Sequence, residues 1–491
     1  GAGFMLVYLK ERDEIIAVDY LGSSPNNSNL QDLFGVKLPR NYEKADRDIV
    51  RYGYKASTVP GTVAGLIEAH TNFGRLPLGS VLQPVIEQAR NGIKVSYDLY
   101  MALENSSQLK KNKESRKIFF SNGSAAKENT ILKREYLAQT LEKIAAEGKK
   151  GFYEGEVAQK IVAAMHSNGG FVSLADLKNY RPRFSEPIRT AYRGNHIFAP
   201  RPPSGGAIVV LDALNILENF TLGKYKSNSS ATYHLLAEAL RRGHMDRSRY
   251  IGDPGFYDVP VEGIISKKRA RELAKTISFK SASSNKSMSP DDFLEESKDT
   301  THYSIIDEDG NAVSNTYTLG YSFGSGVTIP GTGVLMNNHM NNFAYRYGDK
   351  SIRGRTASPA NKFDSGKRPM STMTPVMIFN REGELQLITG SPGGAAIPAA
   401  VLRVITGIID FDLNIGEATM LPRIHKDWPY EDLDYESTAS SDVIAILQNL
   451  GHKMEASKTM GSTQSIHIKD GFNHGYADLR RPNAGVAIQT H

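Results

Sequence analysis

The order of apolar and polar residues divides the chain into a helix-rich first part and a second part rich in paired strands. Short alternating or apolar runs between polar turns predict strands. They lie at 4–8, 15–20, 188–192, 196–199, 302–306, 312–319, 334–338, 374–380, 385–389, around 454, 465–469 and 485–489. Apolar residues at helical spacing predict helices at 82–91, 97–109, 134–147, 156–166, 174–180, 207–217, 230–250, 397–408 and 440–450. Together these patterns predict an α+β fold built in layers.

Composition narrows the class of protein. The chain has 491 residues, 40% of them hydrophobic and 23% charged, which is typical of a globular protein with a substantial core. The net charge is only +6, and the basic cluster at 110–117 is best explained as a solvated surface, so no nucleic-acid partner is expected. Cysteine is absent, which excludes disulfides and thiol chemistry. The histidines show no metal-ligand spacing, so we expect no metal and no cofactor.

The beginning of the chain predicts a missing segment. Residues 1–8 form a Gly-rich turn that enters a buried strand, and a chain rarely begins inside such an element. We therefore expect a leader before Gly1, and a signal peptide is compatible with this. No apolar run has the length of a membrane span. The sequence does not assign a compartment.

The stretch from Asp299 to Ser304 offers candidate chemistry. It follows a loop rich in Ser, Lys and Asp and opens a predicted hairpin whose turn is at 307–311. A cut between Asp299 and Thr300 would give Thr300 a free α-amine beside its own hydroxyl. Such an amine has a pKa of about 7.7–8 and serves as a general base without a histidine. A Thr-Thr pair before a strand is common, so the residues alone leave both an ordinary strand and a nucleophile open.

The wider pattern carries a resemblance. The run Thr300-Thr301-His302-Tyr303-Ser304, followed by blocks at 309–313 and 316–319, resembles the start of the small subunit in the γ-glutamyltranspeptidase family. Further blocks in the same order are at 59–61, 74–77, 151–153, 202–206, 252–254, 366–369, 390–394, 422–425 and 478–481. Members of this family cut themselves before the Thr and then use it to take a γ-glutamyl group.

The resemblance implies a fold and a division of the chain. It implies the four-layer αββα sandwich of the N-terminal nucleophile (Ntn) hydrolases. Residues 1–299 would form the large-subunit region and residues 300–491 the small-subunit region, both within one intertwined domain. The two fragments would stay associated after cleavage, and homo-oligomers are compatible with the sequence.

The resemblance also assigns roles to residues. Thr300 would be the nucleophile, and Thr318, on the second strand of the hairpin, would assist cleavage. Gly393 and Gly394 would supply an oxyanion hole through successive backbone N–H groups, although in isolation they would be taken for a tight turn. Ser371 and Thr372 would bind the carboxylate of the γ-glutamyl group. His302 and His425 are interpreted as structural.

The chain departs from the family pattern where the amino-acid end of the substrate would bind. Leu21 stands where the family usually has an arginine for the α-carboxylate, and Asn342 stands where it has an aspartate for the α-ammonium. Gly320 and His339 replace a polar residue and a Glu or Gln. Arg346 and Arg353, in a segment where some members have a lid, could supply replacement positive charge. The simpler interpretation is that both side chains are solvated.

Three functions follow from these residues. The first is an autoprocessing threonine hydrolase or transferase that cleaves γ-glutamyl amides such as glutathione and passes the acyl group to water or an amino acid. The second is an amidase for other acyl groups, as in the related cephalosporin acylases. The third is a non-catalytic member of the family that binds a ligand.

Overall fold

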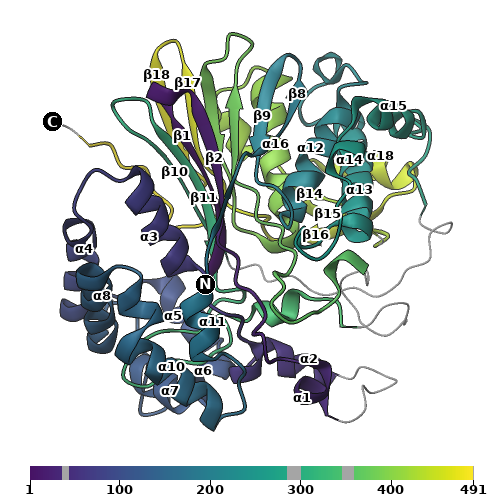
Figure 1. Ribbon diagram of the computed structural model, residues 1–491. Helices are drawn as coiled ribbons and strands as arrows, with labels where there is room; N and C mark the ends of the chain where they lie inside the picture. Colours follow the sequence, from purple (N-terminus) through teal and green to yellow (C-terminus); the bar gives the residue numbers. More distant parts are fainter. Residues whose placement is uncertain (36–43, 285–299, 346–358, 429, 490–491) are drawn as a thin grey trace.

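Two antiparallel sheets form the centre of the computed structural model, which describes residues 1–35, 44–284, 300–345, 359–428 and 430–489 (Figure 1). The first sheet has the order β10-β11-β1-β2-β7. Its strands are β1 (Ala2–Leu9), β2 (Glu14–Asp19), β7 (Arg183–Ser185), β10 (Thr301–Ile306) and β11 (Ala312–Thr318). The predicted hairpins at 4–20 and 302–319 are both confirmed, and β1 pairs with a strand from each of them.

The second sheet has the order β18-β17-β13-β12-β9-β8. Its strands are β8 (Ile188–Tyr192), β9 (Asn195–Ala199), β12 (Val376–Phe379), β13 (Leu385–Thr389), β17 (Gln464–Lys469) and β18 (Phe472–Ala477). Both sheets therefore combine strands from before and after residue 300. Three smaller sheets contain β3 (Ile93–Lys94) with β6 (Ile131–Leu132), β4 (Phe120–Ser121) with β5 (Ser124–Ala125), and β14 (Ile424–His425), β15 (Asp432–Glu436) and β16 (Lys453–Ser457).

Alternation along β1 explains how the sheets pack. Leu6 and Tyr8 point toward the second sheet and form an apolar cluster with Met377, Phe379 and Ile388. The intervening residues of β1 point the other way and pack against helix α3 (Thr62–Phe73). Successive side chains of a strand lie on opposite faces, so one strand serves both contacts.

Helices cover the other side of the second sheet. The largest apolar cluster joins that sheet to α12 (Gly205–Leu217), α13 (Ser230–Tyr250) and α16 (Ile397–Ile409), and every residue of α12 is buried. Around them lie α14 (Val261–Ile264), α15 (Lys267–Lys275), α17 (Ile415–Met420) and α18 (Ser441–Asn449). The mixed helix-and-sheet composition predicted from the sequence is thus confirmed.

The remaining helices gather below α3 at the lower left of Figure 1. They are α4 (Leu78–Asn91), α5 (Tyr97–Glu104), α6 (Ser107–Lys111), α7 (Lys113–Phe119), α8 (Glu135–Glu147), α9 (Lys150–Tyr153), α10 (Gly155–Ser167) and α11 (Leu174–Asn179). Helices α1 (Leu30–Phe34) and α2 (Lys44–Arg51) lie at the lower right of this group. Within the described residues, no helix combines the length and the apolarity needed to span a bilayer.

Three local predictions were wrong. The helix expected at 97–109 is two helices: the first ends at Glu104, and Ser106 caps the second by accepting a hydrogen bond from the Leu109 N–H. The strand expected at 334–338 is reduced to one bridge, between Leu335 and Thr328. Residues 485–489 are not part of any strand, whereas β18, which was not predicted, pairs with β17 along its whole length.

Candidate active site

Thr300 directly precedes β10 at the edge of the first sheet. In the ladder between β10 and β11, Thr301 is opposite Tyr317 and His302 is opposite Thr316. Continuing this register by one residue places Thr300 opposite Thr318. Thr300 is buried, and Arg481 Nη1 donates a hydrogen bond to its carbonyl oxygen at 3.1 Å. Asp299, the other residue of the predicted cleavage site, lies outside the described residues.

The Thr318 hydroxyl is held by the turn that follows β11. It accepts a hydrogen bond from the Gly320 N–H at 2.9 Å and also lies 3.3 Å from the Gly320 carbonyl oxygen. Its position is therefore fixed by backbone contacts two residues further on.

The glycine-rich loop after β13, where an oxyanion hole is predicted, has a backbone that favours glycine at two successive positions. Gly393 has a φ of 136° and Gly394 a φ of 58°, both in a region that L-residues with side chains rarely adopt. A Cβ atom on Gly393 would lie 2.8 Å from the Cα of Gly461. The chain then forms a short 3-10 turn, Gly394–Ala396, and enters α16.

Ser371 and Thr372 lie against the beginning of α12. The Ser371 carbonyl accepts a hydrogen bond from the Gly205 N–H at 2.7 Å, and its N–H donates to the Pro203 carbonyl. A Cβ atom on Gly206 would lie 2.1 Å from the Thr372 carbonyl oxygen, so only glycine allows this approach. Both hydroxyl residues are buried and held by main-chain contacts.

The three residues expected to contact the rest of the acyl group come from two segments that touch: the turn after β11, which contains Gly320, and the turn that contains His339 and Asn342. Gly320 has a φ of 100°, and a Cβ atom there would lie 1.8 Å from Asn338 Oδ1. Asn338 therefore occupies the space that a side chain at position 320 would need. The next residues form a 3-10 turn, His339–Asn342, in which His339 is buried and Asn342 is half-buried.

Leu21 is enclosed. It is 2% exposed, its N–H donates to Asp19 Oδ1, and its carbonyl accepts from the Tyr180 hydroxyl. Asp19 is in turn paired with Arg368, at 2.7 Å. The guanidinium near this point thus comes from Arg368 and is already neutralised by a carboxylate. Arg346 and Arg353, the other candidate sources of charge, lie outside the described residues.

One group of metal-ligating side chains is present among the described residues, formed by His234, Glu238 and His452. The two histidines are hydrogen-bonded to each other at 2.8 Å, and Glu238 accepts hydrogen bonds from Arg242 and Ser283. The three side chains thus belong to a hydrogen-bond network that connects α13 to neighbouring segments.

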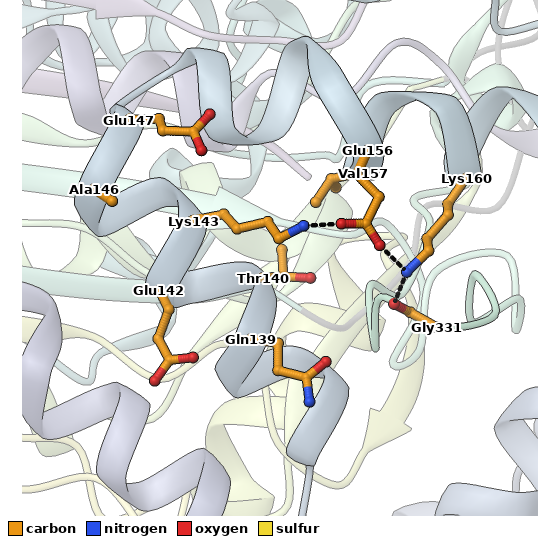
Figure 2. Close-up of a pocket in the computed structure, with 10 residues that line it drawn as sticks. All are labelled: Gln139, Thr140, Glu142, Lys143, Ala146, Glu147, Glu156, Val157, Lys160 and Gly331. Atoms are coloured by element: carbon orange, nitrogen blue, oxygen red, sulfur yellow. Dashed lines mark hydrogen bonds and ion pairs between the residues drawn. The ribbon is translucent and has the colours of Figure 1, made fainter.

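A hollow of about 400 Å³ lies in the helical part, between α8 and α10 (Figure 2). Glu156 is paired there with Lys143 and Lys160, and Lys160 Nζ also donates to the Gly331 carbonyl at 3.2 Å. The lining contains none of the candidate residues, so this hollow is separate from the site around Thr300.

Two residues near the nucleophile have contacts that the sequence did not predict. Arg481 was noted only as part of a block shared with the family, and His302 was interpreted as structural. His302 lies two residues after Thr300, and its ring lies directly over Gly390, the first residue of the glycine-rich loop. The signal available in the sequence was its place in the Thr300–Ser304 run, which did not reveal the contact.

Comparison with known proteins places this chain among a group of related enzymes. The profile of the family described as Gamma-glutamyltranspeptidase matches residues 1–488. The Glutathione hydrolase proenzyme of Escherichia coli is 36% identical over 484 residues, which cover 98% of this chain and 82% of that protein. The Acylase ACY 1 proenzyme of Pseudomonas sp. strain V22 is 33% identical and covers 99% of this chain and 85% of its own length. The crystal structure of cephalosporin acylase from Bacillus halodurans has a TM-score of 0.85 at 26% identity and covers 100% of this chain and 87% of its own.

Proposed function

Because this chain belongs to the γ-glutamyltranspeptidase family and is an enzyme of that type, we propose that it cuts itself before Thr300 and then cleaves γ-glutamyl amides through an acyl-enzyme. The observation that carries this proposal is the register of β10 with β11, which aligns Thr300 with Thr318. Two residues after Thr300, the His302 ring contacts Gly390 at the start of the glycine-rich loop. Glutathione is the substrate class named for the relatives in E. coli and Pseudomonas aeruginosa.

Maturation begins with attack of the Thr300 hydroxyl on the carbonyl carbon of Asp299. The C–N bond to Thr300 breaks and an ester forms, which leaves the Thr300 nitrogen as a free amine. Water then hydrolyses the ester and releases a large fragment ending at Asp299. Thr318, opposite the nucleophile in register, orients the attacking hydroxyl.

Turnover uses the new amine as the general base. It takes the proton from the Thr300 hydroxyl as the oxygen attacks the substrate carbonyl and passes the proton to the leaving amine. The N–H groups of Gly393 and Gly394 stabilise the oxyanion. Water or an amino acid then takes the acyl group from Thr300.

The acyl group would lie among the candidate binding residues. Ser371 and Thr372 offer hydroxyls to its carboxylate, and Gly320, His339 and Asn342 form the opposite wall. No metal or cofactor has a step in this chemistry.

The packing of the sheets supports the fold assigned above. With α3 outside the first sheet and α12 and α16 outside the second, the arrangement fits a four-layer αββα sandwich. Both sheets contain strands from the regions 1–299 and 300–491, so cleavage would cut a loop without separating paired strands. The two regions would therefore remain one intertwined domain.

A second candidate function has its own support. Leu21 and Asn342 are both uncharged, so neither can form an ion pair with the carboxylate or the ammonium of a zwitterionic amino-acid end. The relatives named as acylases cover almost the whole chain. The alternative is an amidase that uses the same Thr300 chemistry on acyl groups without an α-ammonium.

The test measures turnover of two substrates, γ-glutamyl-p-nitroanilide and glutaryl-p-nitroanilide, of which the second lacks the α-amine. Three proteins are compared: wild type, Thr300→Ala and Thr301→Ala. Thr300→Ala should reduce kcat by a factor on the order of a million on either substrate, as removal of the nucleophile does in other hydrolases. Thr301→Ala is the matched control, because Thr301 is exposed on the other face of the strand. Equal rates for Thr300→Ala and wild type would reject the proposal, while preference for the glutaryl substrate would select the amidase.

A further inference from the structure

Thr300, His302 and Ser304 share one face of the nucleophile strand. Alternation along β10 places them on the side that faces the second sheet. Across the ladder, Thr316 is the partner of His302 and Ser314 is the partner of Ser304. His302 is 5% exposed, so its ring must satisfy its hydrogen bonds inside the protein.

The contacts of the ring fix its tautomer. The Ser304 hydroxyl donates to the Gln464 carbonyl at 2.8 Å, so its oxygen must act as acceptor toward His302 Nε2, 3.1 Å away. Nε2 therefore carries the proton. Nδ1 is then the acceptor, and it receives the hydrogen bond of the Thr316 hydroxyl at 2.8 Å. The neutral imidazole is fully satisfied.

The same ring fills the space above Gly390. A Cβ atom on Gly390 would lie 2.3 Å from His302 Cε1 and 2.4 Å from Nδ1. The Gly390 carbonyl accepts a hydrogen bond from the Gln464 N–H, and the Gln464 carbonyl accepts from Ser304. A closed set of contacts thus runs from His302 through Ser304 and Gln464 to Gly390 and back to the ring.

We propose that His302 is a positioning residue, which sets the spacing between the strand carrying Thr300 and the loop carrying Gly393 and Gly394. This inference rests on the proposed function, because only that function makes both elements part of one reaction. Thr300 is two residues from the ring on one side, and Gly393 is three residues from Gly390 on the other. A change in the ring alters the distance between nucleophile and oxyanion hole without touching the substrate.

The role differs from that of a catalytic base. Burial lowers the pKa of His302 to about 3, so the ring stays neutral over the working range of the enzyme. Both nitrogens are engaged by hydroxyl groups, which leaves no lone pair for the substrate. The pH profile of kcat should therefore keep its apparent pKa values when His302 is replaced.

The first test uses His302→Ala and His302→Gln. His302→Ala should lower kcat by about a hundredfold with KM nearly unchanged, because a small displacement of reacting groups has effects of this size. Gln retains an N–H group that can reach Ser304 and should recover part of the loss. His467→Asn, at another buried histidine, controls for general loss of stability. A kcat for His302→Ala within about twofold of wild type would overturn the inference.

The second test leaves the histidine in place. Gly390 has no positive φ, and the three atoms nearest to a Cβ atom there all belong to the His302 imidazole. Gly390→Ala should lower kcat about tenfold or more in wild type but by less than about twofold in a His302→Ala background, as expected for directly coupled sites. Gly79→Ala, where a Cβ atom meets nothing within 4 Å, is the control. An equal loss in both backgrounds would overturn the inference.

The two proposals fail in different ways. Loss of the threonine nucleophile is judged from Thr300→Ala alone, whatever the behaviour of His302. If Thr300→Ala is inactive while the two Gly390→Ala measurements are simply additive, the proposed function stands and the positioning role is rejected.

Discussion

The space between the two sheets has two ends that differ in chemistry. At one end Leu6, Tyr8, Met377, Phe379 and Ile388 form an apolar cluster, with the Tyr8 and Phe379 rings edge to face at a centroid distance of 4.9 Å. At the other end the same inner faces carry Thr300, His302, Ser304, Ser314 and Thr316. There, the Ser314 hydroxyl donates to the Thr389 carbonyl at 3.0 Å.

The difference shows how one sheet interface serves two purposes. Apolar burial is non-directional and tolerates small shifts, so the first end contributes mainly stability. Buried hydroxyls and imidazoles require partners at defined distances, so the second end contributes geometry. Substitutions at the apolar end should therefore change the free energy of unfolding, and those at the polar end should change activity.

The largest expected effect on stability is at the apolar end. Phe379→Ala should destabilise the protein by about 3–5 kcal/mol, because a buried aromatic ring is replaced by a cavity. Denaturant unfolding measures this loss, and the kcat of the folded fraction should be unchanged. A large fall in kcat at full folding would show that the two ends are not separable in function.

The next effect is at the glycine-rich loop. Gly394→Ala keeps the backbone N–H, but a side chain is disfavoured at a φ of 58° and should displace that N–H from the oxyanion. Loss of one oxyanion donor raises the activation barrier by about 2.7–4 kcal/mol. Gly383→Ala is the matched control, since Gly383 also has a positive φ, 84°, and open space around it. Steady-state kinetics should show a fall of about a hundredfold or more for Gly394→Ala. Equal kinetics for the two variants would mean that Gly394 only forms a turn.

A smaller effect is expected from the threonine opposite the nucleophile. Thr318→Ala removes the hydroxyl that is fixed by Gly320 and that faces Thr300 in register. Self-cleavage should slow by about tenfold, because the free energy of one hydrogen bond between uncharged groups is lost. A time course of the two fragments on a denaturing gel measures it. Normal cleavage in Thr318→Ala would assign the hydroxyl to the turn alone.

The smallest effect concerns specificity. Asn342→Asp would supply a negative charge for an α-ammonium, and charge-assisted hydrogen bonds are roughly twice as strong as neutral ones. KM for γ-glutamyl-p-nitroanilide should fall several-fold, while KM for glutaryl-p-nitroanilide should rise. Leu21→Arg is a poor companion, because Leu21 is buried near Arg368 and a second guanidinium there would be uncompensated. Unchanged KM values would place Asn342 outside the acyl site.

Local patterns predicted much of this architecture. The hairpins around 10–13 and 307–311 follow from alternation and polar turns, and they are present. The pairing of β1 with β11 was not predictable in the same way, because it joins residues about 300 positions apart and alternation carries no partner information. The strand predicted at 334–338 failed because Asn337 and Asn338 use their side chains to hold Thr58, Arg51 and Tyr321, which bends the segment.

In the candidate site, too, contacts within one hairpin could be predicted from the sequence and contacts between distant segments could not. Thr300 and Thr318 belong to one hairpin, so their register could be predicted from the sequence. The contact of His302 with Gly390 spans two elements of different sheets and required the structure. Asn338 beside Gly320 is a similar case, since the space it occupies is visible only in three dimensions.

The most direct test of the central claim is the intact mass of the purified, active enzyme, with N-terminal sequencing of its fragments. The account predicts two chains, the smaller of which begins at Thr300, and one uncut chain for Thr300→Ala. An active preparation that consists of a single uncut chain would contradict it, because Thr300 would then have no free α-amine to act as the base.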